Sequence, residues 1–396
     1  MLRRALALPS RRRGPLVLSI VFFFVILHYQ LFQRYDTRPG SARSRLHQPA
    51  AHPASSNALQ EPNPNHNLTI DLVIASRRED DISWTRHLSA AIPNLQVIRY
   101  ISNYLPDKPL PEFHPPLPKK GREATVYHTY LQDFYPRLPD VSIFIHAEEQ
   151  PWHIEGVLQQ SMLFALSHLD YGRIAERGGY TNLRVAWADN CPSGIDTTLP
   201  PEVATRKEVP FMRQAFESNF PDEAFPSMFA GPCCSQFAVT REAIRRNHRS
   251  QYARSQTWLM TNHIGNQKAG RTWEHMWPWL FLHNAPAPFN AQATKDCPAE
   301  WNTYCAMYGI CFGDAETGAD VYDAPSRYND RWAEKETLRR DHLEEWWNRL
   351  FHPLRAAQAA KRIAQFEKEL DEELTVALER GKNEHLRDRA FKGLFA

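Results

Sequence analysis

The first seventy residues follow one another in an order that restricts what the rest of the chain can be. Arginine accounts for five of the first thirteen residues, and an apolar run without a formal charge follows at 14–32. A helix of this length, with about 1.5 Å of rise per residue, can just cross the hydrocarbon core of a bilayer. More Lys and Arg precede the run than directly follow it, where Arg34 and Arg38 stand, so we expect a cytosolic tail at 1–13 and a transmembrane signal anchor at 14–32.

This order predicts a type II membrane protein whose remaining residues face the secretory lumen. A cleaved signal peptide is the alternative, but the apolar run is long for one and no small-x-small cleavage site closes it. The run is short and rich in aromatic residues, which suits the thinner membranes of the early secretory pathway. We therefore expect residence in the Golgi or ER membrane, with membrane contact through this one helix.

A segment without periodic apolar residues separates the run from the globular sequence. Residues 33–69 are rich in Pro, Ser, Ala, His and Asn, a composition typical of a flexible lumenal stem. Asn67-Leu68-Thr69 at its end is an N-glycosylation sequon, which predicts a glycan on Asn67.

All cysteines of the chain lie in the globular part, as is typical of disulfides formed in an oxidising lumen. The six are Cys191, Cys233, Cys234, Cys297, Cys305 and Cys311. The sequence does not choose among their pairings, but Cys233 and Cys234 would be strained if bonded to each other, so we expect each to pair elsewhere or one to stay free. The spacing lacks the two matched pairs of a structural zinc site. A net charge of +2 is too balanced to suggest nucleic-acid binding.

Strand-like and helix-like segments alternate after residue 70, which predicts an α/β domain over 70–320 with a largely parallel sheet flanked by helices. Strands are expected at 70–75, 96–101, 141–145, 183–188 and 236–240, and helices at 82–91, 124–134, 157–169, 241–246 and 272–282. The Pro-rich sequence at 192–232 is expected to be an irregular substrate loop or insertion. Apolar residues at roughly helical spacing in the charged segment 327–396 predict a helical tail without chemistry.

Polar clusters follow three of the expected strands, and ligands of open α/β sheets collect beyond the carboxyl ends of strands. Arg77, Asp81 and Asp189 belong to two of these clusters and are expected to bind the donor. In the third, we expect His146, Glu148 and Glu149 to hold a divalent cation such as Mn²⁺ or Mg²⁺, or one carboxylate to act as a base. The alternative is that the two glutamates cap the next helix, where negative charge is favourable.

A basic loop precedes the helix expected at 124–134. Lys119, Lys120 and Arg122 lie where free N–H groups and the helix dipole attract anions, which predicts a site for a diphosphate. An ordinary solvated charge run is the alternative. The sequence contains neither a P-loop nor a Rossmann glycine fingerprint, so ATP hydrolysis and nicotinamide chemistry have little support.

Glu274 lies among tryptophans on the helix expected at 272–282. Aromatic neighbours can raise the pKa of a carboxyl group or stack on a sugar face, which makes Glu274 a candidate general base. The alternative is a core helix whose one carboxylate faces solvent. A serine hydrolase is less favoured, because no Gly-x-Ser-x-Gly elbow occurs.

Five segments together resemble a fungal family of type II membrane proteins known as domain of unknown function 3431. They are 76–84, 121–124 with the helix after them, the strand that runs into 146–148, 233–244 and 273–281. The resemblance spans about residues 70–313, and the pattern of the family is similar to GT-A-type glycosyltransferases. It implies a GT-A-like fold.

Two local similarities carry that implication. Residues 237–242 are similar to the strand, Ser/Thr-Arg pair and helix of branching N-acetylglucosaminyltransferase-like enzymes. The Trp-Glu-His-Met-Trp run at 273–277 is similar to the Glu-His-Phe-Trp-type helix that carries their catalytic base, which implies that role for Glu274. The usual Asp-x-Asp metal motif is missing, and the cluster at 146–149 occupies its expected place.

These expectations describe a lumenal glycosyltransferase that moves a sugar from a nucleotide-sugar donor to a glycan, glycoprotein or glycolipid. One alternative is a lumenal hydrolase or metalloenzyme built on His146, Glu148, Glu149 and His153. The other is a non-catalytic, lectin-like scaffold that uses its tryptophan-rich surface.

We predict that Asn67 carries a glycan and that the C-terminus is protected from protease in sealed microsomes, because the basic flank precedes the apolar run. Digestion of epitope-tagged protein in intact and detergent-opened vesicles measures this. A C-terminus that is cut in intact vesicles would contradict the lumenal orientation.

Overall fold

We describe the protein from a computed structural model in which residues 67–203, 205–313, 321–344 and 351–395 are described. All of these residues belong to the unit Gln60–Ala396. The expected cytosolic tail, signal anchor and nearly all of the stem lie outside these ranges. Within them, no helix combines the length and the apolar character that a membrane span needs.

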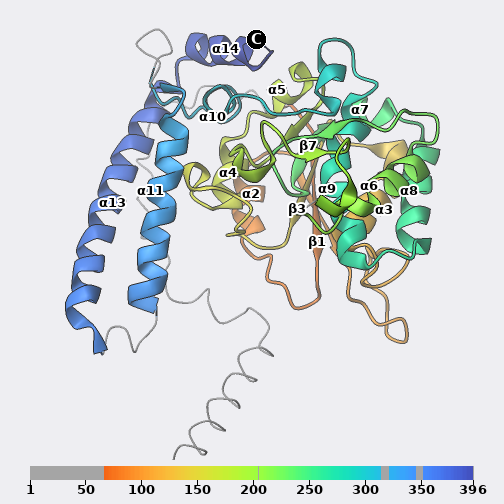
Figure 1. The fold of residues 1–396 in the computed structure, drawn as a ribbon, viewed down its shortest axis with the longest axis horizontal. Helices are drawn as coiled ribbons and strands as arrows, with labels where there is room; N and C mark the ends of the chain where they lie inside the picture. Colours follow the sequence, from red (N-terminus) through yellow and green to blue (C-terminus); the bar gives the residue numbers. More distant parts are fainter. Residues whose placement is uncertain (1–66, 204, 314–320, 345–350, 396) are drawn as a thin grey trace, which may run out of the picture. The chain divides into compact units, whose positions relative to one another are not determined.

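A five-stranded sheet forms the centre of this unit (Figure 1). Across the sheet the strands are β2 (Leu95–Ile101), β1 (Ile70–Ser76), β3 (Val141–His146), β7 (Phe237–Thr240) and β4 (Tyr180–Asn182). β1 runs parallel to β2 and β3, with Ile70 opposite Leu95 and Val141. β7 runs antiparallel to both of its neighbours, β3 and β4. The sheet is therefore mixed, and the expected parallel arrangement is confirmed for β2, β1 and β3.

Helices cover both faces of the sheet, which explains why β1 is apolar on both sides. Ile70, Leu72 and Ile74 point into one hydrophobic cluster, and Val73 points into the other. The first cluster contains residues of α2 (Thr85–Ala91), α4 (Met162–His168), α5 (Tyr171–Glu176), α10 (Glu300–Tyr308), α11 (Ala324–Arg339), α13 (Pro353–Arg380) and α14 (Glu384–Lys392). The second contains residues of α3 (Arg122–Asp133), α6 (Val209–Asn219), α7 (Arg241–Arg245), α8 (Arg249–Thr261) and α9 (Asn266–Leu282).

Aromatic side chains pack α3 and α9 together under the sheet. Trp273 and Trp277 are fully buried one helical turn apart on α9. The Trp277 ring centroid lies 5.9 Å from that of Tyr127 on α3, and the Trp273 ring lies 4.2 Å from that of His128. The helix expected at 272–282 is confirmed and begins earlier, at Asn266.

Two expectations about the middle of the chain are wrong. No strand forms at 183–188; the strand lies just before it, as β4. The amides of Val185 and Ala186 donate instead to one carboxylate oxygen of buried Glu155, so they are not free to pair with a neighbouring strand. The segment 192–232 is not irregular throughout, because it contains α6 and a two-stranded sheet of β5 (Ile195–Asp196) and β6 (Met228–Phe229).

The helix expected at 157–169 forms as two separate pieces. A 3₁₀ turn, η2, covers Gly156–Leu158 and α4 begins at Met162. Gln159 and Gln160 have φ angles of 58° and 48°, values that a continuous right-handed helix excludes. The Ser161 side chain accepts the Phe164 amide and caps α4.

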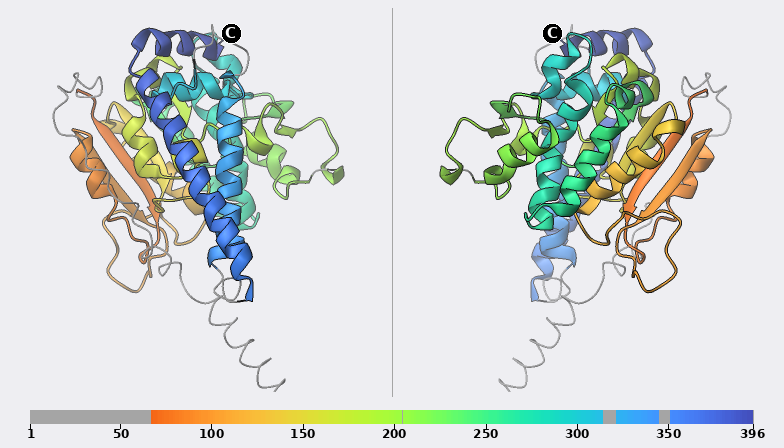
Figure 2. Two further views of the ribbon diagram at one scale, coloured as in Figure 1. Left: turned by 90° about the vertical axis from the view of Figure 1, so that its left-hand side faces the viewer. Right: turned by 90° about the vertical axis from the view of Figure 1, so that its right-hand side faces the viewer.

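The C-terminal tail is helical, as expected, and it packs on the same core as the sheet. α11 and α13 lie side by side (Figures 1 and 2), and α14 packs on α10. Phe366, Leu370 and Leu374 of α13 are buried in the first cluster. Gly381, which ends α13, meets Gly309 at the end of α10 so closely that a Cβ atom on Gly381 would lie 1.7 Å from the Gly309 carbonyl oxygen.

We predict that Gly381→Ala lowers the free energy of unfolding, because the methyl group would meet backbone that cannot swing away. Overpacking of a folded core typically costs about 1–3 kcal/mol. Gly265→Ala is the matched control, since a Cβ there would meet nothing within 4 Å. Denaturant unfolding of both variants measures the difference. Equal losses from the two substitutions would contradict the close contact of Gly381 with Gly309.

Candidate active site

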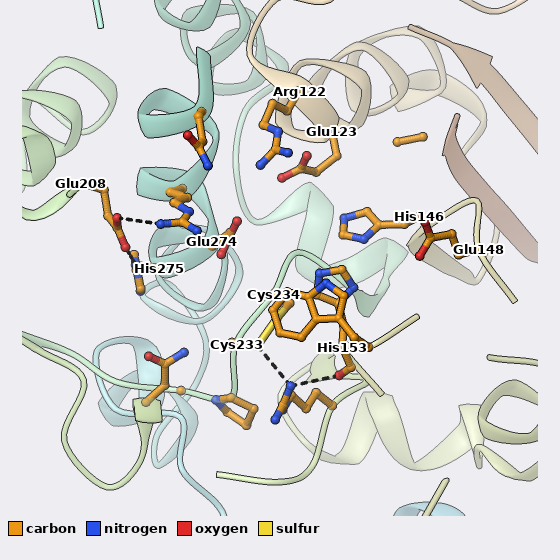
Figure 3. Close-up of a pocket in the computed structure, with 18 of the residues that line it drawn as sticks. Arg122, Glu123, His146, Glu148, His153, Glu208, Cys233, Cys234, Glu274 and His275 are labelled. Atoms are coloured by element: carbon orange, nitrogen blue, oxygen red, sulfur yellow. Dashed lines mark hydrogen bonds and ion pairs between the residues drawn. A yellow bond between two sulfur atoms is a disulfide. The ribbon is translucent and has the colours of Figure 1, made fainter. Parts of the chain in front are cut away.

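A cavity of about 1430 Å³ opens beyond the carboxyl ends of the parallel strands. Residues that end or directly follow those strands line it, among them Ser76 at the end of β1, Ser102 after β2 and His146 at the end of β3. Helices α3 and α9 supply another part of the lining, and the segment before β7 a further part (Figure 3). The position agrees with the rule that ligands of open α/β sheets bind at this edge.

The basic loop brings two of its three expected cations to the cavity. Lys119 and Arg122 line it, whereas the Lys120 ammonium donates to the Asn262 carbonyl 3.3 Å away. Gly121 allows the turn: its φ is +65°, and a Cβ there would lie 2.2 Å from the Thr125 hydroxyl. Within the described ranges, the side chains of Lys119 and Arg122 form neither a hydrogen bond nor an ion pair, so both charges are available to an anion.

The cluster after β1 reaches the cavity through Arg77 and not through Asp81. Arg77 lines the cavity, but its guanidinium is paired with Asp80 at 2.8 Å. Asp81 accepts the Ser83 amide and does not line the cavity. Asp189 lies in the 3₁₀ turn η3 (Ala188–Asn190), whose first and last residues line the cavity.

The cluster after β3 is brought to the cavity only in part. His146 and Glu148 line the cavity, but Glu149 does not. Among the residues that the structure describes, no three His, Cys, Asp or Glu side chains are placed to hold a metal ion. The Glu149 carbonyl accepts the amide of Met162 at the start of α4. The three residues expected to hold a divalent cation are therefore not gathered at one point of the cavity wall.

Two imidazoles lie together at this end of the cavity. The ring centroids of His146 and His153 are 4.8 Å apart. Burial lowers the pKa of His146 to about 4, and the positive charge of Arg122 adds to the effect. Burial also lowers the pKa of His153 to about 3. Both rings are therefore neutral at physiological pH.

Glu274 projects from α9 into the cavity and faces the first turn of α3 (Figure 3). Its carboxyl group forms no hydrogen bond or ion pair with any residue of the described ranges. Burial raises the pKa of Glu274 to about 8, and the negative charge of Glu123 adds to the shift. Glu123 lines the same cavity, so two carboxyl groups from different helices share one space.

Glu208 and His275 form a further acid–imidazole pair in the cavity that the sequence did not reveal. The His275 ring nitrogen lies 3.3 Å from one Glu208 oxygen, and an Arg271 nitrogen lies 3.6 Å from the other. Glu208 directly precedes α6, in the segment expected to be irregular. No local motif marks it, and only the packing of α6 on α9 brings the pair together.

The structure pairs all of the cysteines, and it corrects one expectation. Cys191 bonds to Cys297 and Cys305 bonds to Cys311, with Cα atoms 5.7 Å and 4.3 Å apart. Cys233 and Cys234 bond to each other, although we expected such a bond to be too strained. Cys234 has a φ of 83°, so the backbone turns at this residue and the two sulfur atoms can meet. Both residues line the cavity, and Arg184 donates to the Cys233 sulfur at 3.5 Å.

Asn67 is exposed at the start of the described residues, where a glycan can be attached. Thr69 of the same sequon is held by Asp140, to which its hydroxyl donates at 2.7 Å.

Comparison with known families shows that the sheet and the cavity lie in a region that one family model matches. A family model described as "Protein of unknown function (DUF3431)" matches residues 72–306. The chain belongs to this family. The match runs from β1 into α10, so the family region contains every residue that lines the cavity. No curated protein and no solved structure gives a significant match.

We predict that Glu274→Gln stabilises the protein at pH 8 and not at pH 4. The folded protein keeps a proton on Glu274 up to about pH 8, whereas the ordinary value is 4.5. Between these values the folded state binds more protons than the unfolded state, so the free energy of unfolding of the wild type falls as pH rises. The Glu274→Gln variant has no carboxyl group to titrate here, so its free energy of unfolding does not fall for this reason. Thermal unfolding across pH measures it, with Glu242→Gln, which changes an exposed carboxylate on α7, as the control. A constant wild-type-to-variant difference across pH would contradict burial of the carboxyl group.

Proposed function

We propose that this protein is a lumenal glycosyltransferase that moves a sugar from a nucleotide-sugar donor to a glycan or glycoconjugate. The observation that carries the proposal is the arrangement in one cavity of the Glu274 carboxyl group and the cations Lys119 and Arg122, none of which has a partner among the described residues. A glycosyl transfer needs both, a base for the acceptor hydroxyl and positive charge for the leaving diphosphate. We also propose the type II topology and Golgi or ER residence expected from the first seventy residues.

The diphosphate of the donor would lie at the start of α3. Lys119 and Arg122 supply the charge there, and the N–H groups of the first helical turn add their dipoles. Small-molecule sites are commonly about 300–1,000 Å³. A cavity of about 1430 Å³ therefore leaves space for a nucleotide sugar and part of an acceptor.

In the proposed reaction Glu274 takes the proton of the acceptor hydroxyl. The freed oxygen attacks the anomeric carbon, and the bond between that carbon and the diphosphate oxygen breaks. The electron pair leaves with the nucleoside diphosphate, whose negative charge Lys119 and Arg122 stabilise. Attack on the face opposite the leaving group inverts the anomeric centre.

We propose that the α/β fold is more specifically a GT-A-like domain, and the arrangement of the sheet supports this. The parallel strands β1, β2 and β3 end at the proposed donor site, as expected for nucleotide binding at such a sheet. The similarity of residues 237–242 and 273–277 to branching transferases points the same way, since they form β7 with the start of α7 and the middle of α9.

Glycan binding without turnover is the second candidate, and one observation favours it. Trp152 lines the cavity while 68 % of its surface is exposed. An exposed indole at a cavity wall is suited to stack on a sugar face.

We predict that Glu274→Gln lowers sugar transfer by roughly 10²–10⁴-fold, the usual contribution of a general base, and changes donor affinity little. A panel of nucleotide sugars, tested first for binding and then for transfer, identifies the donor. Glu242→Gln is the control, because it removes an exposed carboxylate outside the cavity. Equal transfer by wild type and Glu274→Gln would remove Glu274 from the mechanism, and glycan binding without transfer would favour the second candidate.

We also predict that kcat/KM of the wild type rises with pH up to about 8. Glu274 must be ionised to accept a proton, and its pKa in the free enzyme is raised to about 8. The rate should fall about tenfold for each pH unit below that value. A rate that is flat between pH 6 and pH 8 would contradict Glu274 as the base.

A further inference from the structure

Three aromatic rings form a row along the cavity wall beyond β3. His146 ends that strand, and Trp152 and His153 lie in the turn that follows it. All three residues line the cavity. The ring centroids of Trp152 and His153 are 4.1 Å apart, and those of His153 and His146 are 4.8 Å apart. The row ends on the exposed indole of Trp152, whereas both histidines are partly buried.

Trp152 is unusual for its residue type in this protein. A single exposed apolar side chain on a protein surface needs no functional explanation. Among the described residues, however, Trp152 is the one tryptophan that is exposed, and it is exposed at a cavity rather than on an outer surface. Its ring also continues into two imidazoles. The position therefore combines an apolar ring with polar groups, as a sugar-binding site requires.

The row is held in a defined position by the elements behind it. The guanidinium of Arg184 donates to the His153 carbonyl at 3.3 Å. The amide of His146 donates to the Gln236 side chain at 3.2 Å, and Gln236 is itself buried at the start of β7. A ligand would thus meet a preformed wall, and little conformational entropy would be lost on binding.

The ring nitrogens of the row have no partner within the described part of the chain. Neither the Trp152 indole nor the imidazoles of His146 and His153 form a hydrogen bond or an ion pair there. Nε2 of His146 and Nδ1 of His153 are enclosed by protein, whereas the other nitrogen of each ring is not. That second nitrogen is the atom that a ligand in the cavity can reach.

The charges at this wall disfavour an anionic ligand. Arg184 lines the cavity, but its guanidinium donates to two carbonyls, those of His153 and Ala186, both at 3.3 Å. Glu148 lies in the same strand-to-turn segment and also lines the cavity. Its carboxylate would repel an acidic sugar. A neutral ligand with hydroxyl groups avoids this repulsion.

We propose that His146, Trp152 and His153 form an acceptor subsite that binds a neutral sugar residue of the glycan. The indole of Trp152 stacks on the apolar face of the pyranose ring. The sugar hydroxyls bond to the reachable ring nitrogens, because a hydroxyl can both donate and accept, and a neutral imidazole offers one donor and one acceptor. The three side chains therefore select a neutral, ring-shaped ligand with an apolar face.

The assignment of this sugar as the acceptor rests on the proposed function. The diphosphate of the donor would lie at the start of α3, so the wall beyond β3 remains for the second substrate. The two places adjoin, since the positive charge of Arg122 contributes to the lowered pKa of His146. Figure 3 shows Glu274, His146 and His153 around one cavity, so a sugar on the row can direct a hydroxyl group to the proposed base.

The test measures the binding of neutral sugars to the full-length protein in detergent. The probes are methyl glycosides of glucose, galactose, mannose and N-acetylglucosamine, with short oligosaccharides of each, and saturation-transfer NMR detects them with and without nucleoside diphosphates. Trp152→Ala should weaken binding roughly tenfold, because the stacked ring is lost. Trp152→Phe keeps a ring and should retain most of the affinity. Phe351→Ala is the matched control, since Phe351 is 69 % exposed and does not line the cavity.

A second variant tests the polar part of the row. His153→Phe keeps an aromatic ring beside Trp152 but removes both ring nitrogens, so binding should weaken roughly fivefold. Inorganic pyrophosphate, which would occupy the start of α3, should not displace the sugar. Because Trp152 is exposed, its substitution does not threaten the fold, and Trp152→Ala decides the proposal even if His153→Phe fails to fold.

Three results would overturn the acceptor subsite. They are an unchanged sugar affinity in Trp152→Ala, displacement of the sugar by pyrophosphate, and a wild type that binds only acidic glycans or no glycan at all.

The outcome for the subsite can be separated from the outcome for the transferase. In an active enzyme Trp152→Ala should raise KM for the acceptor and change kcat little. Transfer that depends on Glu274, together with an unchanged acceptor KM in Trp152→Ala, would support the transferase and contradict the subsite. Sugar binding that depends on Trp152, without transfer from any donor, would support sugar binding at this wall and contradict the transferase.

Discussion

The close approach of α3 to α9 at Gly270 holds the site together. A Cβ at Gly270 would lie 3.3 Å from the Cδ of Arg122, so even the smallest side chain there would press on the stem of Arg122. The first turn of α3 carries Arg122 and Glu123, while the next turn of α9 carries Glu274 and His275. Below the contact, the rings of Tyr127 and Trp277 pack at 5.9 Å. Apolar burial between the two helices therefore offsets the free energy of bringing two carboxyl groups into one space.

Among the described residues of the cavity, some charged side chains are paired with an opposite charge and others are not. The acidic side chains beside Arg77 and Arg271 pair with those arginines, whereas Lys119 and Arg122 stay free within the described part of the chain. The electrostatic attraction of an anionic ligand would thus be strongest at the start of α3. Glu274, on the wall of the same cavity, has no cation within ion-pair distance among the described residues, and burial keeps it protonated at neutral pH. A group held in this costly environment is typical of a functional carboxyl.

Much of the sheet could be predicted from local pattern, but the site could be predicted only in part. β1, β3 and β7 are short apolar runs that end at polar clusters, and their positions follow from the sequence alone. Glu274 could be found because it is the one carboxylate in a tryptophan-rich helix. Glu208 could not, because its partner His275 is far away in the sequence and no periodicity marks the segment before α6. The general rule on strain disfavours the Cys233–Cys234 bond, and the bond forms where the backbone at Cys234 is left-handed.

The tail also belongs to the site, although its sequence suggested no chemistry. Trp332 of α11 packs on Gly156, where a Cβ would lie 2.3 Å from the indole. Asn329 of the same helix accepts the Val157 amide at 2.9 Å. The segment held in this way begins three residues after His153, which lines the cavity. Just before it, Glu155 accepts from the Tyr304 hydroxyl of α10 and from two amides next to Arg184, another cavity residue. Helices α10 and α11 therefore hold one wall of the cavity in place. Local loosening of α11, which follows the family region, would reach the imidazoles before it reached Glu274 on α9.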